Sequence, residues 1–323
     1  MAIKIIYNVA ILFAMMLPGV ILKLCKLTPD GFGKGISNLV LYVAQPCLIF
    51  RAYLKEFDKE ILINSLVVLL LSIIAHLVFL LALLFYKKSF DDRRRMLRFA
   101  TIFSNAAFMG IPLIEVVLGA EYTIYASIYN ITFNMFLWTL GVHICTDKNE
   151  MPDGRILESQ ASVKRAIFHP VTIAAALGII FFVIPVSNKV EAIPEIVKEC
   201  LNMISSLVAP LSMLVLGLRI PDIKLRAVIR DINLYLFILL RHLALPLVVF
   251  GIMALLHFTV LPIAEKLFMV VLILAAAPAA SSATMFAEKY ECDAAFVSSL
   301  VVVSTILSIL TMPLMVVPVG FIY

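Results

Sequence analysis

Long apolar runs alternate with short polar connections along the whole chain. The hydrocarbon core of a bilayer is about 30 Å thick, and about 20 residues of α-helix cross it. The pattern therefore predicts an all-α membrane protein with ten transmembrane helices. The predicted spans are 5–24, 35–54, 61–86, 97–118, 121–144, 167–186, 195–219, 230–257, 265–287 and 292–318.

The longest polar connection divides these spans into five and five. It predicts a first five-helix repeat at 1–144, a cytoplasmic connecting loop at 145–166 and a second five-helix repeat at 167–323. Because each half has an odd number of spans, homologous halves would be inverted relative to each other in the membrane.

The fourth predicted span contains three residues that oppose a straight helix: Asn105, Gly110 and Pro112. Proline lacks an amide N–H and clashes with the carbonyl four residues earlier. Glycine weakens a helix, and an asparagine amide can replace a lost backbone partner. Irregular backbone survives at membrane depth only inside protein or beside a wet cavity. The stretch therefore predicts a broken helix.

The ninth predicted span repeats this pattern in "LAAAPAASSATMF". Pro278 opposes the helix, and Ser281, Ser282 and Thr284 supply hydroxyl groups where a second half-helix would begin. Half-helices that begin near the bilayer midplane present free N–H groups and a positive dipole end there. Such ends attract anions, carboxylates in particular. The two breaks together predict an anion site, and kinks that serve packing alone are the alternative.

Composition and charge agree with a membrane protein. The chain is 63% hydrophobic and 15% charged, whereas soluble domains are about 45–50% apolar and about 25% charged. Of 26 lysines and arginines, 18 lie in the connections after odd-numbered spans, 7 lie on the opposite side and one, Arg241, lies inside a span. The positive-inside rule then places the first group in the cytoplasm and both termini outside the cell membrane. We expect the net charge of +5 to reflect these loops and not nucleic-acid binding.

Two ionisable residues inside the spans each have two interpretations. Arg241 could bind a substrate carboxylate through its guanidinium. It could instead pair with Glu115, or extend its head toward the membrane interface. Glu115 could carry a coupling proton or serve as a structural ion-pair partner.

Three amide residues inside the predicted spans are candidates to support the site. Asn130 and Asn134 lie four residues apart and share one helix face. They could contact a cation or the substrate, or hydrogen-bond between helices. Gln45, just before Pro46, has the same two interpretations. The five histidines and five cysteines form no cluster in the sequence, so we expect no metal site and no cofactor.

Four segments, "FSNAAFMGIPL", "YNITFNMFLWTLG", "APLSMLVLGLRI" and "AAAPAASSATMFAEKY", resemble the auxin efflux carrier family, and the resemblance covers essentially the whole chain. It implies the ten-helix inverted-repeat fold shared with bile-acid/sodium symporters. In that fold the fourth and ninth helices are broken and cross near the bilayer midplane, so Asn105, Pro112 and Pro278 would lie at the crossing. The short connection between the halves resembles the bacterial branch, which includes malonate and malate permeases, and not the plant carriers.

We therefore expect a secondary transporter of small organic anions, such as malate, malonate or auxin-like acids, in the cytoplasmic membrane. By resemblance, transport would use an elevator-type alternating-access motion. Coupling to H⁺ or Na⁺ and assembly as a homodimer stay open. The first alternative is a membrane-embedded ligand sensor on a carrier fold. An intramembrane enzyme is less expected, because no span carries an HExxH, a GxSxG or a paired-acid motif.

Overall fold

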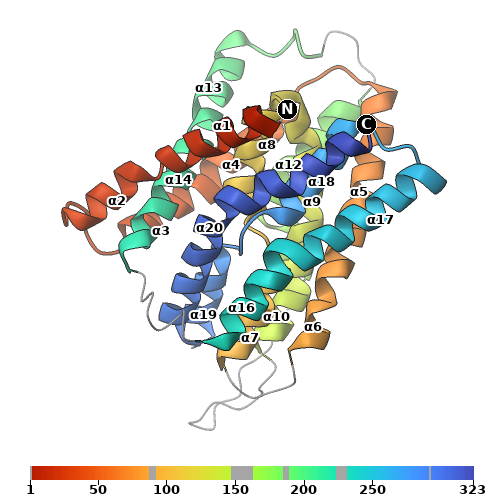
Figure 1. Ribbon diagram of the computed structural model, residues 1–323. Helices are drawn as coiled ribbons and strands as arrows, with labels where there is room; N and C mark the ends of the chain where they lie inside the picture. The colour runs from red at the N-terminus through yellow and green to blue at the C-terminus, as the bar shows by residue number, and fades with distance from the viewer. Residues whose placement is uncertain (1, 87–91, 147–162, 185–188, 223–230, 291) are drawn as a thin grey trace.

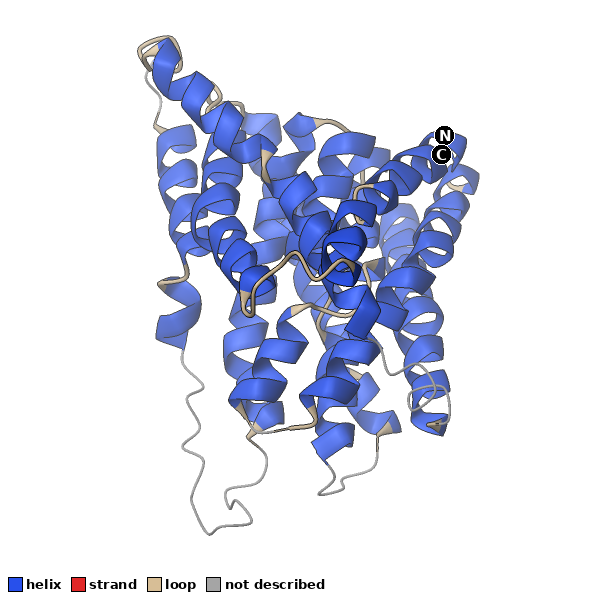
Figure 2. Cartoon of the chain, turned by 90° about the vertical axis from the view of Figure 1, so that its left-hand side faces the viewer, coloured by secondary structure: helices blue, strands red, loops and turns tan. Residues whose placement is uncertain are grey.

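The structure is a computed structural model that describes residues 2–86, 92–146, 163–184, 189–222, 231–290 and 292–323. This part of the chain is helical, and its only extended pairing is a single antiparallel bridge between Ser104 and Ala279. Most helices run between the same two ends of the molecule, and both termini lie at one of these ends (Figures 1 and 2).

Six helical runs in the described residues are long and apolar enough to cross a membrane. They are Tyr7–Leu24, Phe32–Ala52, Lys59–Phe85, Glu195–Asp222, Ile232–Thr259 and Ala294–Phe321. Two shorter apolar helices are Ala106–Val117 and Pro170–Val183. The protein is therefore an all-helical, multi-pass membrane protein over its described part.

The predicted first half contains a series of α-helices, several of them interrupted or extended by short π-helical or 3-10 turns, which are labelled η. They are α1 (Ala2–Ala14), α2 (Leu17–Leu24), α3 (Phe32–Leu39), η1 (Val40–Ala44), α4 (Gln45–Ala52), α5 (Lys59–Leu80), α6 (Ala82–Phe85), α7 (Asp92–Ile102), η2 (Ala106–Gly110), α8 (Ile111–Val117), η3 (Ala120–Tyr122), α9 (Thr123–Phe136), η4 (Leu137–Gly141) and α10 (Val142–Cys145).

The predicted connecting loop lies mostly outside the described residues, which resume at residue 163. The helices that follow are α11 (Val163–Ile167), α12 (Pro170–Val183), α13 (Glu195–Ser206), α14 (Val208–Arg219), η5 (Ile220–Asp222), α16 (Ile232–Leu239), η6 (Leu240–Ala244), α17 (Leu245–Thr259), α18 (Glu265–Ala276), α19 (Ser282–Lys289), α20 (Ala294–Val316) and η7 (Val317–Phe321).

Three of the helical runs contain a π-helical turn just before a proline. A proline inside an α-helix loses a hydrogen bond and clashes with the preceding turn. A π turn is wider than an α turn, which lets the chain pass the proline while the helix continues. The three pairs are Val40–Ala44 with Pro46, Ala106–Gly110 with Pro112, and Leu240–Ala244 with Pro246.

Helices α2 and α14 pack with their backbones in close contact, and two glycines allow it. A Cβ at Gly217 would lie 2.0 Å from the Met16 carbonyl oxygen, and a Cβ at Gly19 would lie 2.3 Å from the Leu214 carbonyl oxygen. Small residues are the usual means of bringing membrane helices together, since lipid provides no hydrophobic drive between them. These two glycines therefore determine how the two helices pack.

Candidate functional site

The fourth and ninth predicted spans are both interrupted, and the two interruptions lie against each other. Helix α7 ends at Ile102 and η2 begins at Ala106, whereas α18 ends at Ala276 and α19 begins at Ser282. The Asn105 N–H donates to the Pro278 carbonyl oxygen at 2.7 Å. A second bond between the two interruptions, 2.8 Å long, runs from Ala280 N–H to the Phe103 carbonyl oxygen. Each interruption therefore satisfies backbone groups of the other, as a break inside a membrane requires.

The break in the fourth span does not include Gly110 and Pro112, which we expected to interrupt it. Both residues lie in the continuous helical run Ala106–Val117, because the π turn accommodates the proline. Gly110 instead lets α18 approach, since a Cβ there would lie 2.6 Å from Leu274 Cδ2. In the ninth span, Pro278 lies within the break as expected.

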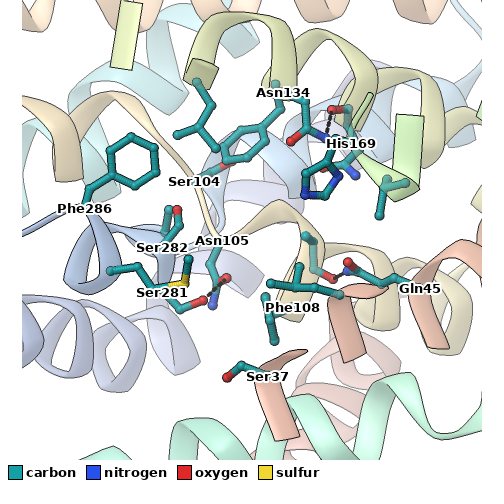
Figure 3. Close-up of a pocket in the computed structure, with 18 of the residues that line it drawn as sticks. Ser37, Gln45, Ser104, Asn105, Phe108, Asn134, His169, Ser281, Ser282 and Phe286 are labelled. Carbon is teal, nitrogen blue, oxygen red and sulfur yellow. Dashed lines mark hydrogen bonds between the residues drawn. The ribbon is translucent and has the colours of Figure 1, made fainter. Parts of the chain in front are cut away.

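A cavity of about 70 Å³ lies beside the two breaks (Figure 3). We call it the central cavity. One water needs about 10–15 Å³ of such space, so it has room for several waters or a small solute. Its polar lining comes from both breaks and from the surrounding helices. These residues are Ser37, Gln45, Ser104, Asn105, Asn130, Asn134, Trp138, His169, Arg219, Ser281 and Ser282.

The Asn105 side chain points from the first break toward Ser281 of the second (Figure 3). Ser281 Oγ donates to Asn105 Oδ1 at 3.2 Å. Asn105 is only 2% exposed, and its Nδ2 group has no partner among the described residues. An unpaired buried donor costs about 1–3 kcal/mol. This amide is therefore available to a solute or water in the central cavity.

The other predicted amides also line the central cavity. Gln45 Nε2 donates to the Ala107 carbonyl oxygen at 2.6 Å, and Asn134 Nδ2 donates to the Asn130 carbonyl oxygen at 3.0 Å. Gln45 Oε1 and Asn130 Oδ1 are buried without a partner in the described part of the chain. These two acceptors, together with the Asn105 Nδ2 donor, are left for a ligand or water in the central cavity.

Arg219 is the one arginine or lysine among the described residues that line the central cavity, although its place in the sequence predicts only a loop residue. It is the last residue of α14, and its Nη1 donates to the Ser281 carbonyl oxygen at 3.1 Å and to Thr284 Oγ1 at 3.5 Å. Its position at the end of the "LVLGLR" run was the available signal. His169, at the N-terminus of α12, is a second lining residue that the sequence did not single out.

Arg219 also lines a wider outer hollow of about 360 Å³. Other polar residues of the outer hollow include Lys23, Lys34, Asp222, Thr284 and Glu288. Thr284, expected near the central cavity, therefore lies in the outer hollow. Ser37, Arg219 and Met285 line both spaces, so the two spaces adjoin.

Arg241 and Glu115 do not form the ion pair considered above. Glu115 pairs with Arg51, away from the central cavity. Arg241 is fully buried, and it donates to carbonyl oxygens of Thr101, Ala275 and Ala277. Neither residue lines the central cavity, so the structure does not bring them to the predicted anion site.

The amino-acid sequence matches a family of known proteins over nearly its whole length. Residues 4–316 match the family described as "Membrane transport protein". An uncharacterized transporter of Methanothermobacter thermautotrophicus is 28% identical over 306 residues, which cover 93% of each chain. An uncharacterized transporter of Methanocaldococcus jannaschii is 25% identical over 312 residues, which cover 95% of this chain and 96% of the relative. The family match extends over both breaks and over the residues that line the central cavity.

Proposed function

Because this chain belongs to the membrane transport protein family, the auxin efflux carrier family that its motifs resemble, we propose that it is a secondary transporter of small organic anions. The substrates would be carboxylates of the size of malate, malonate or an auxin-like acid. The observation that carries this proposal is that Asn105 and Arg219 line one small cavity beside the two breaks.

Charge favours an anion in the central cavity. Arg219 supplies a guanidinium, which suits a carboxylate in a bidentate geometry. Helix α19 begins at Ser282, which lines the cavity, so the positive end of the helix dipole lies beside the cavity. No aspartate or glutamate is among the described residues that line the cavity. A carboxylate would therefore meet donors without meeting a like charge.

The apolar part of the lining favours an organic solute over an inorganic ion. Phe108, Phe133, Leu137 and Phe286 line the same cavity as the amides. Binding sites for small molecules commonly combine apolar walls with a few placed polar groups. A short carbon chain would pack against these side chains while its carboxylate contacts Asn105 and Arg219.

The proposal includes alternating access by movement of one group of helices against another. The residues that line the central cavity come from α3, α4, α12 and α14 and from the two broken runs with α9, and in this proposal these are the two groups that move against each other. Sliding between these groups, as in an elevator-type motion, would carry the breaks and the bound anion together. The ten spans would form two inverted repeats, with the broken helices crossing near the bilayer midplane.

Orientation follows the distribution of positive charge. The outer hollow is lined by residues from the connections after the first, seventh and ninth predicted spans, including Lys23 and Arg219. These connections are on the side expected to face the cytoplasm. In this proposal the outer hollow is the cytoplasmic approach to the central cavity. Both termini, which share one end of the molecule, would lie outside the cell membrane (Figure 1).

Liposomes containing the purified protein test the proposal. Uptake of labelled malate, malonate and indole-3-acetate would be measured with Na⁺ and H⁺ gradients set independently, with protein-free liposomes as the control. Saturable uptake of at least one carboxylate is the expected result. Saturable binding of a carboxylate without flux would instead support a sensor, and consumption of the compound would support an enzyme.

A further inference from the structure

Arg241 donates hydrogen bonds to both broken helices and is not among the residues that line the central cavity. It lies in the π turn η6, and its side chain is fully buried. Nε donates to the Ala277 carbonyl oxygen at 3.1 Å, and Nη1 donates to the Thr101 carbonyl oxygen at 3.1 Å. Nη2 donates to the Ala275 carbonyl oxygen at 2.9 Å and also to that of Ala277. One side chain thus makes four hydrogen bonds to three carbonyl oxygens.

These oxygens belong to the C-terminal ends of the first half-helices. Thr101 is in the last turn of α7, Ala275 is in the last turn of α18, and Ala277 follows α18 directly. The last carbonyls of a helix have no partner within it, and they form the negative end of its dipole. Two such ends meet at Arg241, whose guanidinium donates to carbonyl oxygens of both.

The positive charge of Arg241 is compensated without a carboxylate. Among the described residues it has no ion-pair partner. Its guanidinium carbon lies 4.5 Å from the centre of the Phe79 ring, a cation–π distance. Burying a charge in a membrane protein is expensive, and such residues usually have a functional reason. Here the compensation comes from the carbonyl dipoles.

We propose that Arg241 is a built-in cation that occupies the place of a coupling metal ion at the two broken helices. Unwound carbonyls and half-helix C-terminal ends hold Na⁺ or H⁺ in transporters with discontinuous helices. In this protein a tethered guanidinium already uses these oxygens. A second cation at the same place would be repelled by it and would lack free oxygen ligands. Transport is therefore independent of Na⁺.

This inference rests on the proposed function, but its first test does not measure transport. The thermal unfolding midpoint of the detergent-purified protein would be compared in NaCl and in choline chloride at equal ionic strength. The expected midpoint is the same in both. A saturable rise with Na⁺ concentration would show a separate sodium site and overturn the proposal.

Two substitutions distinguish a cation site from simple packing. Arg241→Met removes the charge at similar length, and we expect the midpoint to fall by at least about 5 °C. Millimolar guanidinium or Na⁺ should partly restore it, because the carbonyl site would then be open to a free cation. Arg241→Lys keeps the charge and should lose less stability than Arg241→Met. Equal losses in the two variants, or no recovery of Arg241→Met by either cation, would overturn the proposal.

Arg98→Met is the matched control. Arg98 is also buried and lies in α7, but among the described residues its guanidinium donates to one carbonyl oxygen, that of Tyr86, which is not at the end of a broken half-helix. Its loss should lower the midpoint without recovery by guanidinium or Na⁺, and recovery there would show that the rescue is unspecific and contradict the proposal. In liposomes, wild-type uptake should be unchanged when choline replaces Na⁺, whereas uptake that requires Na⁺ would overturn it. If no carboxylate is taken up, the transport function fails, while the thermal data still decide the role of Arg241.

Discussion

Asn105 donates its backbone N–H to the carbonyl oxygen of Pro278, and this 2.7 Å bond joins the two breaks. Its side chain accepts a bond from Ser281 Oγ, in the second break. These two hydrogen bonds fix both the backbone and the side chain of Asn105. Its unpaired Nδ2 group is therefore oriented before any ligand binds. A preoriented donor of this kind loses little freedom when a substrate binds.

Asn105→Ala should strongly weaken transport. It removes the free donor and the Ser281 contact, while the backbone bond to Pro278 stays possible. A hydrogen bond to a charged group is worth about 1.5–3 kcal/mol, so the KM for a carboxylate should rise about ten- to a hundredfold. Uptake into liposomes measures this. Asn202→Ala, at an exposed residue, should behave as the wild type. Equal KM values for the two variants would exclude Asn105 from binding.

Arg219→Gln should reduce the affinity for carboxylates, because it removes the positive charge of the central cavity. Arg219→Lys should retain part of that affinity, since a lysine keeps the charge but cannot bind in a bidentate manner. We expect KM to rise at least about tenfold for Arg219→Gln. The control is Arg51→Gln, because Arg51 pairs with Glu115 outside the cavity. A similar rise in Arg51→Gln would point to general damage in place of lost substrate contacts.

The sequence predicted the broken helices but misplaced one break. Pro112 is the strongest local signal in the fourth span, yet a π turn accommodates it. The chain breaks instead at Ser104 and Asn105. There the backbone hydrogen-bonds to residues of the ninth span. Local helix propensity could not show the position of this break. The hydrogen bonds that stabilise the non-helical backbone there come from a segment distant in the sequence.

The amides of the site were predictable, whereas its cation was not. An asparagine or glutamine inside an apolar run is conspicuous, as at Gln45 and Asn130. An arginine at the end of a run, such as Arg219, usually extends into solvent, and only the fold shows that it turns toward Ser281. The sequence showed that Arg241 needs partners, but it could not show that these are carbonyl oxygens.

Gly217→Ala should destabilise the protein by separating α2 from α14. The added Cβ would lie 2.0 Å from the backbone oxygen of Met16, which cannot move aside as a flexible side chain could. Overpacking of this kind costs about 1–3 kcal/mol or more, so the unfolding midpoint should fall by at least about 2 °C. Gly251→Ala is the control, because a Cβ at Gly251 meets no atom within 4 Å. A midpoint for Gly217→Ala equal to that of the control would contradict the close helix contact.

Pro278→Ala and Pro112→Ala should differ, because only Pro278 lies in a break. Alanine at position 278 restores an N–H and favours helix, so α18 could extend into the break and pull the carbonyl group of residue 278 away from Asn105. Transport should fall at least about tenfold, while expression and the unfolding midpoint change little. Alanine at position 112 only replaces a proline that a π turn already accommodates. It should leave uptake near the wild-type level.

The same liposome assay, with the amount of folded protein in each sample equalised, measures both proline variants. If Pro112→Ala abolished transport and Pro278→Ala did not, the functional break would lie at Gly110–Pro112. The backbone bonds between Asn105 and Pro278 would then be structural only. The paired design distinguishes a proline inside a break, Pro278, from a proline inside a continuous helical run, Pro112, because each variant changes one broken span and leaves the other unchanged.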